Sequence, residues 1–264
     1  MTAPTAGMQL RNVSFEIHGA RLLQSLTLDI ESEGITGVLG QNGSGKSTLL
    51  KILARHHTAS TGEATYAGRP LSAWRDRQFA RAIAYLPQQI APAAGLKVRE
   101  LVALGRYPWH GPLGRFGRSD HAKVDEAIAL TGLQSFADRY VETLSGGERQ
   151  RAWLAMLVAQ DARLLLLDEP IAALDVAHQV EMLRLLRRLS AEQHIASVVV
   201  IHDINMAARF CDRLVALKGG RLIAQATPEE LMRPEKLLEI YDIPMAVVRE
   251  PGSASPIAFV CDAP

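Results

Sequence analysis

Two glycine-rich motifs and one pair of acids are the parts of this sequence best suited to chemistry on phosphate groups. They are GQNGSGKST (residues 40–48), LSGGE (144–148) and LLLLDEP (164–170). The first fits the pattern G-x-x-x-x-G-K-[ST], in which backbone N–H groups close around phosphate oxygens. Lys46 would then neutralise the β- and γ-phosphates, and the Ser47 hydroxyl would ligate Mg²⁺, a hard cation that favours oxygen ligands. A glycine-rich turn with an exposed lysine is the alternative.

The residues around the first motif predict the strand, loop and helix order that phosphate binding requires. ITGVLG (35–40) is typical of a buried strand, and STLLKILARH (47–56) indicates the opening of a helix. The N-terminus of such a helix carries roughly half a positive charge, which would face the bound anion.

Three short apolar runs predict parallel strands, which are buried on both faces and therefore lose polar alternation: residues 35–39, 163–167 and 197–201. Ligands of open α/β sheets bind beyond the carboxyl ends of such strands. We therefore expect Gly40, Asp168 and His202, which follow these runs, to converge on one site.

The second motif and the acidic pair each have a chemical and a structural interpretation. Asp168 and Glu169 follow a strand, where successive side chains diverge, so one carboxylate can face magnesium while the other orients water. They could also be solvated loop residues. Ser145 and the two glycines of LSGGE precede an apparent helix whose first N–H groups could bind an anion. A simple helix cap is the alternative.

Apolar spacing predicts further helices, which suggest a helical subdomain between the two halves of the core: residues 97–104, 120–130 and 147–160. The helix after Asp175 should pack through one stripe, formed by Val176, Val180, Leu183 and Leu186. From about Thr227 we expect a short tail. Its MAVVRE and PIAFV segments should form a small hairpin around residues 252–255.

Composition limits the possible partners and location. The 264 residues include 29 Lys and Arg against 28 Asp and Glu, which gives a formal charge of +1 and disfavours a nucleic-acid partner. The start lacks a signal-peptide pattern, and no apolar run is long enough to span a bilayer. We therefore expect a cytosolic chain that reaches the membrane only through a partner. Cys211 and Cys261 are expected to be ordinary buried or half-buried thiols.

Taken together, the motifs resemble the nucleotide-binding subunit of ATP-binding cassette (ABC) transporters over about residues 10–231. The resemblance implies an α/β fold: a RecA-like P-loop NTPase core with a mostly parallel sheet, an inserted helical subdomain and an antiparallel β edge. One ABC ATPase domain would span residues 8–231, with the helical subdomain at about 90–160 and a short C-terminal extension at 232–264.

The same resemblance assigns roles to individual residues. The phosphate cradle would be Gly40, Asn42, Gly43, Ser44, Gly45, Lys46, Ser47 and Thr48. Asp168 would hold Mg²⁺ through water, Glu169 would be the general base, and His202 would contact the γ-phosphate and the attacking water. Gln88 would sense magnesium and water, with Gln89 as the neighbouring candidate.

The resemblance also implies the assembly. Two copies would sandwich two ATP molecules head to tail, so that Ser145 and Gly147 act in trans and Asp175 lies at the dimer seam. An integral membrane permease would be bound at the cytoplasmic face of the inner membrane, where the chain is peripheral. A periplasmic or lipid-anchored substrate-binding protein would take part indirectly.

Two departures from the family pattern affect these assignments. The seam motif usually begins with Thr-Ser, but here it reads Ile171-Ala172, which removes two hydroxyls. Where the family commonly stacks an aromatic ring on adenine, this chain has Ile17 and His18.

Three further segments narrow the resemblance: LKVRELVALGRYPWHGPLGRFG (96–117), AHQV (177–180) and HDINMAARFCD (202–212). They resemble type II importer ATPases for iron chelates, especially ferric hydroxamate siderophores. Heme or vitamin B12 import is the alternative, followed by a soluble ABC ATPase of DNA repair or translation and by a non-catalytic regulatory cassette. The aromatic residues of the first segment, Tyr107, Trp109 and Phe116, suit either the subdomain core or a loop that receives the permease.

Overall fold

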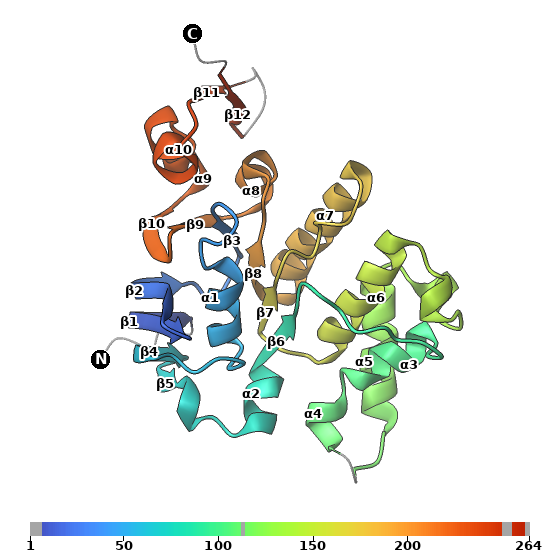
Figure 1. Cartoon of the computed structure of the whole chain (residues 1–264). Helices are drawn as coiled ribbons and strands as arrows, with labels where there is room; N and C mark the ends of the chain where they lie inside the picture. The colour runs from blue at the N-terminus through green and yellow to red at the C-terminus, as the bar shows by residue number, and fades with distance from the viewer. Residues whose placement is uncertain (1–6, 112–113, 250–254, 262–264) are drawn as a thin grey trace. The chain divides into compact units, whose positions relative to one another are not determined.

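The computed structural model describes residues 7–111, 114–249 and 255–261 (Figure 1). The chain divides into two compact units. Unit 1 combines Met1–Ala73 with Ala196–Pro264, and unit 2 is Trp74–Ile195.

Unit 1 holds most of the strands. Its first half contains β1 (Met8–Ile17), β2 (Ala20–Ile30), β3 (Ile35–Leu39), α1 (Lys46–Leu53), β4 (Thr61–Tyr66), β5 (Arg69–Pro70) and a 3₁₀ turn, η1 (Leu71–Ala73). Its second half contains β8 (Ala196–Val200), α8 (Ile204–Phe210), β9 (Arg213–Lys218), β10 (Arg221–Ala226), α9 (Pro228–Leu231), α10 (Pro234–Tyr241), β11 (Met245–Val248) and β12 (Ile257–Val260).

Two kinds of sheet occur in unit 1, and their burial explains their sequences. Strands β2, β1, β4 and β5 form an antiparallel sheet in that order, whereas β3 pairs in parallel with both β8 and β9. Every residue of β3 and β8 is buried, which accounts for their mainly apolar sequences. β10 pairs antiparallel with β9 and supplies an antiparallel edge.

Unit 2 is mainly helical. It contains α2 (Asp76–Ala82), β6 (Ile83–Leu86), α3 (Val98–Leu104), α4 (Tyr107–His110), α5 (Arg118–Leu130), α6 (Gly146–Ala159), β7 (Leu164–Leu167), α7 (Val176–Gln193) and the 3₁₀ turns η2 (Gln134–Phe136) and η3 (Val141–Thr143). β6 and β7 run parallel. α3, α5 and α6 pack against one another around buried side chains such as Leu101, Val124 and Leu154 (Figure 1).

The elements predicted from apolar patterns are present. β3 spans the predicted residues, and β7 and β8 begin within one residue of the expected start. The three predicted helices of the subdomain correspond to α3, α5 and α6. β11 and β12 form the predicted hairpin, although residues 252–254 of its turn lie outside the described residues. Cys211 is buried and Cys261 is half-buried, as expected.

One detail of the sequence predictions is wrong, and the structure adds detail to two others. Val176 is 67% exposed, because the buried face of α7 begins only at Met182, after the first turn. α1 ends at Leu53 rather than at His56. The tail after Thr227 contains two helices, α9 and α10, each with a proline in its first turn, where the missing N–H costs nothing.

The aromatic residues of segment 96–117 fit neither of the two predicted settings as a group. Tyr107 is half exposed, whereas Trp109 donates its indole N–H to the Gln160 carbonyl at 2.8 Å. Both belong to the one-turn helix α4 rather than to a loop. Residues 112 and 113 of this segment lie outside the described residues.

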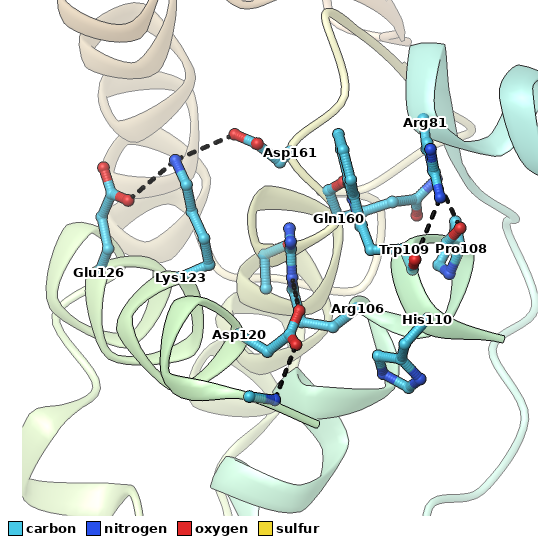
Figure 2. A network of polar contacts seen from close by, with 12 residues as sticks. Arg81, Arg106, Pro108, Trp109, His110, Asp120, Lys123, Glu126, Gln160 and Asp161 are labelled. Carbon is cyan, nitrogen blue, oxygen red and sulfur yellow. Dashed lines mark hydrogen bonds and ion pairs between the residues drawn. The ribbon is translucent and has the colours of Figure 1, made fainter. Parts of the chain in front are cut away.

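A buried ion pair fixes α4 against α5 and α6 (Figure 2). Arg106 Nε donates to Asp120 Oδ1 at 2.9 Å, and Arg106 Nη1 donates to the Ala159 carbonyl at 2.8 Å. The Trp109 ring lies against the guanidinium groups of both Arg106 and Arg81. The Gly117 N–H donates to the other Asp120 oxygen at 3.0 Å. The Arg106 side chain therefore links the start of α4 to both α5 and α6.

Among the described residues, no helix combines the length and the apolar character that crossing a bilayer requires.

We predict that Asp120→Asn lowers the free energy of unfolding by about 3 kcal/mol at neutral pH, because Arg106 stays buried without its counter-charge. The pKa of Asp120 lies below its usual range, chiefly because the Gly117 N–H donates to the carboxylate. The stabilisation by Asp120 is therefore fully present above the pKa that its carboxyl group has in the unfolded chain. It is lost as the pH falls through the pKa of Asp120 in the folded protein. The difference between the wild type and the variant should shrink in acid.

Urea unfolding of both proteins at several pH values measures this difference. Asp125→Asn is the matched control, because Asp125 lies on the same helix and pairs with Arg99 at an exposed position. It should cost less than about 1 kcal/mol. Equal losses in the two variants would contradict the prediction.

Candidate functional site

The glycine-rich loop after β3 has a backbone that only glycine adopts easily. Gly40, Gly43 and Gly45 have positive φ values of 139°, 78° and 101°. A Cβ atom on Gly40 would lie 2.1 Å from the carbonyl oxygen of Leu217 in β9. The close approach of β9 therefore requires glycine at the point where the chain leaves β3 and turns toward α1.

Lys46 is the first residue of α1 and is only 5% exposed. Its Nζ donates to the carbonyl oxygens of Gly40 and Gln41, each at 2.8 Å. No acidic residue lies in the first turn of α1, so the lysine and the helix N-terminus combine into a positive field. This field favours a phosphate group.

Hydroxyl groups line the same turn. Ser47 and Thr48 follow Lys46 in α1, and both are half-buried. Ser44 Oγ is buried and has no hydrogen-bond partner in the described part of the chain. A buried hydroxyl without a partner costs free energy, and a phosphate oxygen would satisfy it. The loop therefore fits a nucleotide phosphate chain.

His202 follows the carboxyl end of β8, the strand that pairs with β3 in unit 1. In the parallel pairing of β3 with β8, Val38 lies opposite Val200, and the Ile201 N–H donates to the Val38 carbonyl at 3.2 Å. Gly40 and His202 each follow this pair by two residues. The parallel register therefore brings the start of the phosphate loop and His202 to neighbouring strand ends, while the convergence of both with Asp168 stays a prediction.

Unit 2 carries the acidic pair and Gln88. The Asp168 N–H continues the ladder of β6 and β7 by donating to the Leu86 carbonyl at 2.9 Å. Glu169 follows with a φ of 53°, a left-handed conformation that is uncommon outside glycine. Gln88 Nε2 donates to Glu169 Oε2 at 2.7 Å. This bond joins Gln88 to Glu169, whereas the role of Gln88 or Gln89 as a sensor stays a prediction.

Asp168 is 2% exposed, so its carboxylate is held in a buried setting beside Tyr85. Burial, followed by the charge of Asp168, raises the pKa of the Tyr85 hydroxyl well above its usual value. The hydroxyl therefore stays protonated, which suits a hydrogen bond to the carboxylate.

The structure supports the helix-cap interpretation of LSGGE, and the anion-site interpretation stays a prediction. Ser145 caps α6, because its side chain accepts from the Glu148 N–H at 3.3 Å and Glu148 accepts from the Ser145 N–H at 2.8 Å. The bond from the Ser145 N–H is the main cause of the lowered pKa of the Glu148 carboxyl group. At Gly147, a Cβ atom would lie 2.5 Å from the His178 ring. A side chain at position 147 would therefore have to displace the His178 ring where α7 approaches the motif.

The seam motif leads directly into α7. Asp175 is the N-cap residue of α7 and accepts from the His178 N–H at 2.9 Å. Its carboxylate also contacts His178 Nδ1 at 2.8 Å. Ile171, which replaces a hydroxyl residue of the family pattern, is buried. His178 thus links Asp175 to Gly147 within unit 2.

Ile17 and His18, the residues at the expected adenine position, are both exposed at the turn between β1 and β2. Neither is an aromatic platform fixed by packing. Sequence reasoning gave no role to two other residues: Gln41, whose side chain contacts the C-terminal extension, and His178. Gln41 stands at a position that the motif leaves open, and only the AHQV string marked His178.

Comparison with known proteins agrees with the motifs. The family model for the ABC transporter matches residues 23–172. The iron(3+)-hydroxamate import ATP-binding protein FhuC of Bacillus subtilis (strain 168) is 39% identical over 241 residues, which cover 91% of this chain and 90% of the relative. The ferric enterobactin transport ATP-binding protein FepC of Escherichia coli (strain K12) is 36% identical over 258 residues, covering 97% and 95%.

Solved structures show the same fold. An inward-facing metal-chelate type ABC transporter aligns with a TM-score of 0.84 and 25% identity, covering 97% of this chain and 98% of that chain. The two relatives and the solved structure each cover at least 91% of this chain. The chain belongs to the ABC transporter family.

Proposed function

We propose that this chain is the ATP-hydrolysing subunit of an importer that takes up a ferric siderophore of the hydroxamate class. The observation that carries the hydrolytic part is the 2.7 Å hydrogen bond from Gln88 to Glu169, in a strained turn directly after the buried Asp168. A carboxylate held in this way is suited to activating a water molecule.

The phosphate loop would bind the nucleotide. Lys46 would exchange its two carbonyl acceptors for phosphate oxygens, and the backbone N–H groups of residues 42–48 would surround the phosphate chain. Ser47 would ligate Mg²⁺, and Asp168 would hold it through water. When bound, the metal supplies charge neutralisation on the phosphates.

The remaining residues would act on the attacking water. Glu169 would accept its proton, Gln88 would hold the Glu169 carboxylate in place, and His202 would contact the γ-phosphate. The assignment needs a water within hydrogen-bond reach of the base, in line with the terminal phosphate.

Hydrolysis would require a second copy of the chain. Ser145 and Gly147 would complete the phosphate site of the partner, with Asp175 at the seam, in an isologous contact. The dimer would drive an integral membrane permease from the cytoplasmic face of the membrane, and a substrate-binding protein would deliver the cargo. Residues 8–231 would act as one ATPase domain.

The cargo assignment rests on likeness to relatives, because the cargo would never touch this chain. The hydroxamate and enterobactin relatives named above match over at least nine-tenths of their own length. Heme or vitamin B12 remains the alternative cargo.

We predict that Glu169→Gln reduces ATP turnover by at least about a hundredfold, because the amide keeps the shape of the side chain but cannot accept the proton. The variant should form a dimer held by ATP and Mg²⁺. Phosphate release and size-exclusion chromatography with nucleotide measure the two effects. Glu192→Gln, at an exposed position on α7, is the control and should behave like the wild type. A Glu169→Gln variant that stays monomeric alone and fails to close in the permease complex would contradict the proposal.

We predict that a cell lacking this chain loses growth on a ferric hydroxamate as its sole iron source. The wild-type chain should restore growth and Lys46→Ala should not, because the variant cannot neutralise the phosphates. Growth curves and uptake of labelled iron chelate measure this. Normal growth on hydroxamates together with lost uptake of heme or vitamin B12 would overturn the cargo assignment while leaving the ATPase assignment intact.

A further inference from the structure

The C-terminal extension contacts the phosphate loop through one side chain. Gln41, the second residue of the loop motif, donates from Nε2 to the Tyr241 carbonyl at 2.7 Å and to Asp242 Oδ2 at 3.3 Å. Tyr241 is the last residue of α10, and Asp242 is its C-cap. These contacts join positions about 200 residues apart within unit 1.

The main-chain carbonyl of Gln41 accepts hydrogen bonds from other residues of the phosphate loop. It accepts from Lys46 Nζ at 2.8 Å and from the Ser44 N–H at 3.2 Å. The same residue thus contacts the phosphate-binding lysine through its backbone and α10 through its side chain. A displacement of α10 would therefore move the Gln41 carbonyl, to which Lys46 Nζ donates.

The end of α10 is built to stay in place. Leu237 and Ile240 are fully buried, and Asp242 has a φ of 59°, with its N–H donating to the Leu238 carbonyl at 2.9 Å. Burial and the charge of Asp203 raise the pKa of Tyr241 to about 12, so its buried hydroxyl stays neutral. α10 is therefore a packed element of unit 1.

Lys218 compensates for the charge of Asp242. Its Nζ donates to Asp242 Oδ1 at 2.6 Å and to the Glu239 carbonyl at 2.8 Å. The bond from Lys218 is also the main cause of the lowered pKa of Asp242, which therefore stays ionised. An uncompensated carboxylate bonded to the phosphate loop would repel a bound anion, and the ion pair reduces that repulsion.

The extension also holds the helix that follows His202. Asn205 in α8 donates to the Ala258 carbonyl at 3.0 Å and accepts from the Ala258 N–H at 2.7 Å. α10 thus contacts the phosphate loop, and the hairpin of β11 and β12 contacts the helix that follows His202.

We propose that α10 positions the phosphate loop through Gln41, with the Tyr241 carbonyl and Asp242 as acceptors and with Lys218 fixing Asp242. We name these four residues the C-terminal tether. The proposal rests on the proposed function, because it takes the loop as the ATP phosphate site. The tether orders the loop before ATP binds. The conformational entropy of the loop is therefore not lost in the binding step, which favours ATP affinity. Its loss should weaken ATP affinity and leave the chemical step unchanged.

The test uses the full chain with Gln41→Ala and Asp242→Gly. Glycine suits the left-handed conformation at position 242, so this variant removes the carboxylate without straining the backbone. Gln41→Ala should raise the Kd for ATP about fivefold, the effect of roughly one net hydrogen bond, and kcat should change by less than about twofold. Asp242→Gly should raise the Kd in the wild type but have no further effect in the Gln41→Ala chain. Calorimetry and phosphate release measure the two constants.

Two controls separate the possible outcomes. Lys236→Ala removes the Lys236–Glu239 ion pair from the same helix and should leave the Kd unchanged. Lys46→Ala tests the proposed function itself, because unchanged ATP binding in that variant would overturn the phosphate-loop assignment. The tether is overturned if Gln41→Ala binds ATP like the wild type, or if the effects of Gln41→Ala and Asp242→Gly multiply. A lower melting temperature with an unchanged Kd would also overturn it.

Discussion

The burial of the Lys46 ammonium group is the interaction on which the rest of the site depends. A buried charge requires close polar partners, and here these are the main-chain carbonyls of Gly40 and Gln41. For both carbonyls to face the first turn of α1, the chain must leave β3 through glycine conformations beside β9. The conformation of the loop therefore depends on the buried lysine.

The same physical logic places the other polar residues. β3, β8, β6 and β7 are nearly all apolar, so polar side chains can follow only where the strands end. Parallel pairing then puts those ends in register: His202 stands at the level of Gly40 in unit 1, and Gln88 and Glu169 meet in unit 2. Register rather than sequence distance decides which residues act together.

The sequence was sufficient to predict β3 and the glycine-rich loop after it, because an apolar run indicates a buried strand and the glycines mark the turn within a few residues. The family resemblance singled out Gln88 as a sensor of magnesium and water and Glu169 as a general base, but it did not predict the hydrogen bond between their side chains. The sequence failed at Val176, because an apolar side chain does not show where the packing against a helix begins. It left Tyr107 and Trp109 undecided, because the stacking of Trp109 on Arg81 and Arg106 joins different elements.

Gln41 shows why a motif can conceal a contact. The pattern G-x-x-x-x-G-K-[ST] constrains the residues whose backbone or charge meets phosphate, and it leaves position 41 open. At an open position, a side chain can serve the rest of the chain without disturbing phosphate binding. Here the side-chain amide of Gln41 donates to the Tyr241 carbonyl of α10, while the main-chain carbonyl of Gln41 accepts from Lys46 Nζ. The open positions of a phosphate loop are thus where an extension outside the ATPase core can act on nucleotide affinity.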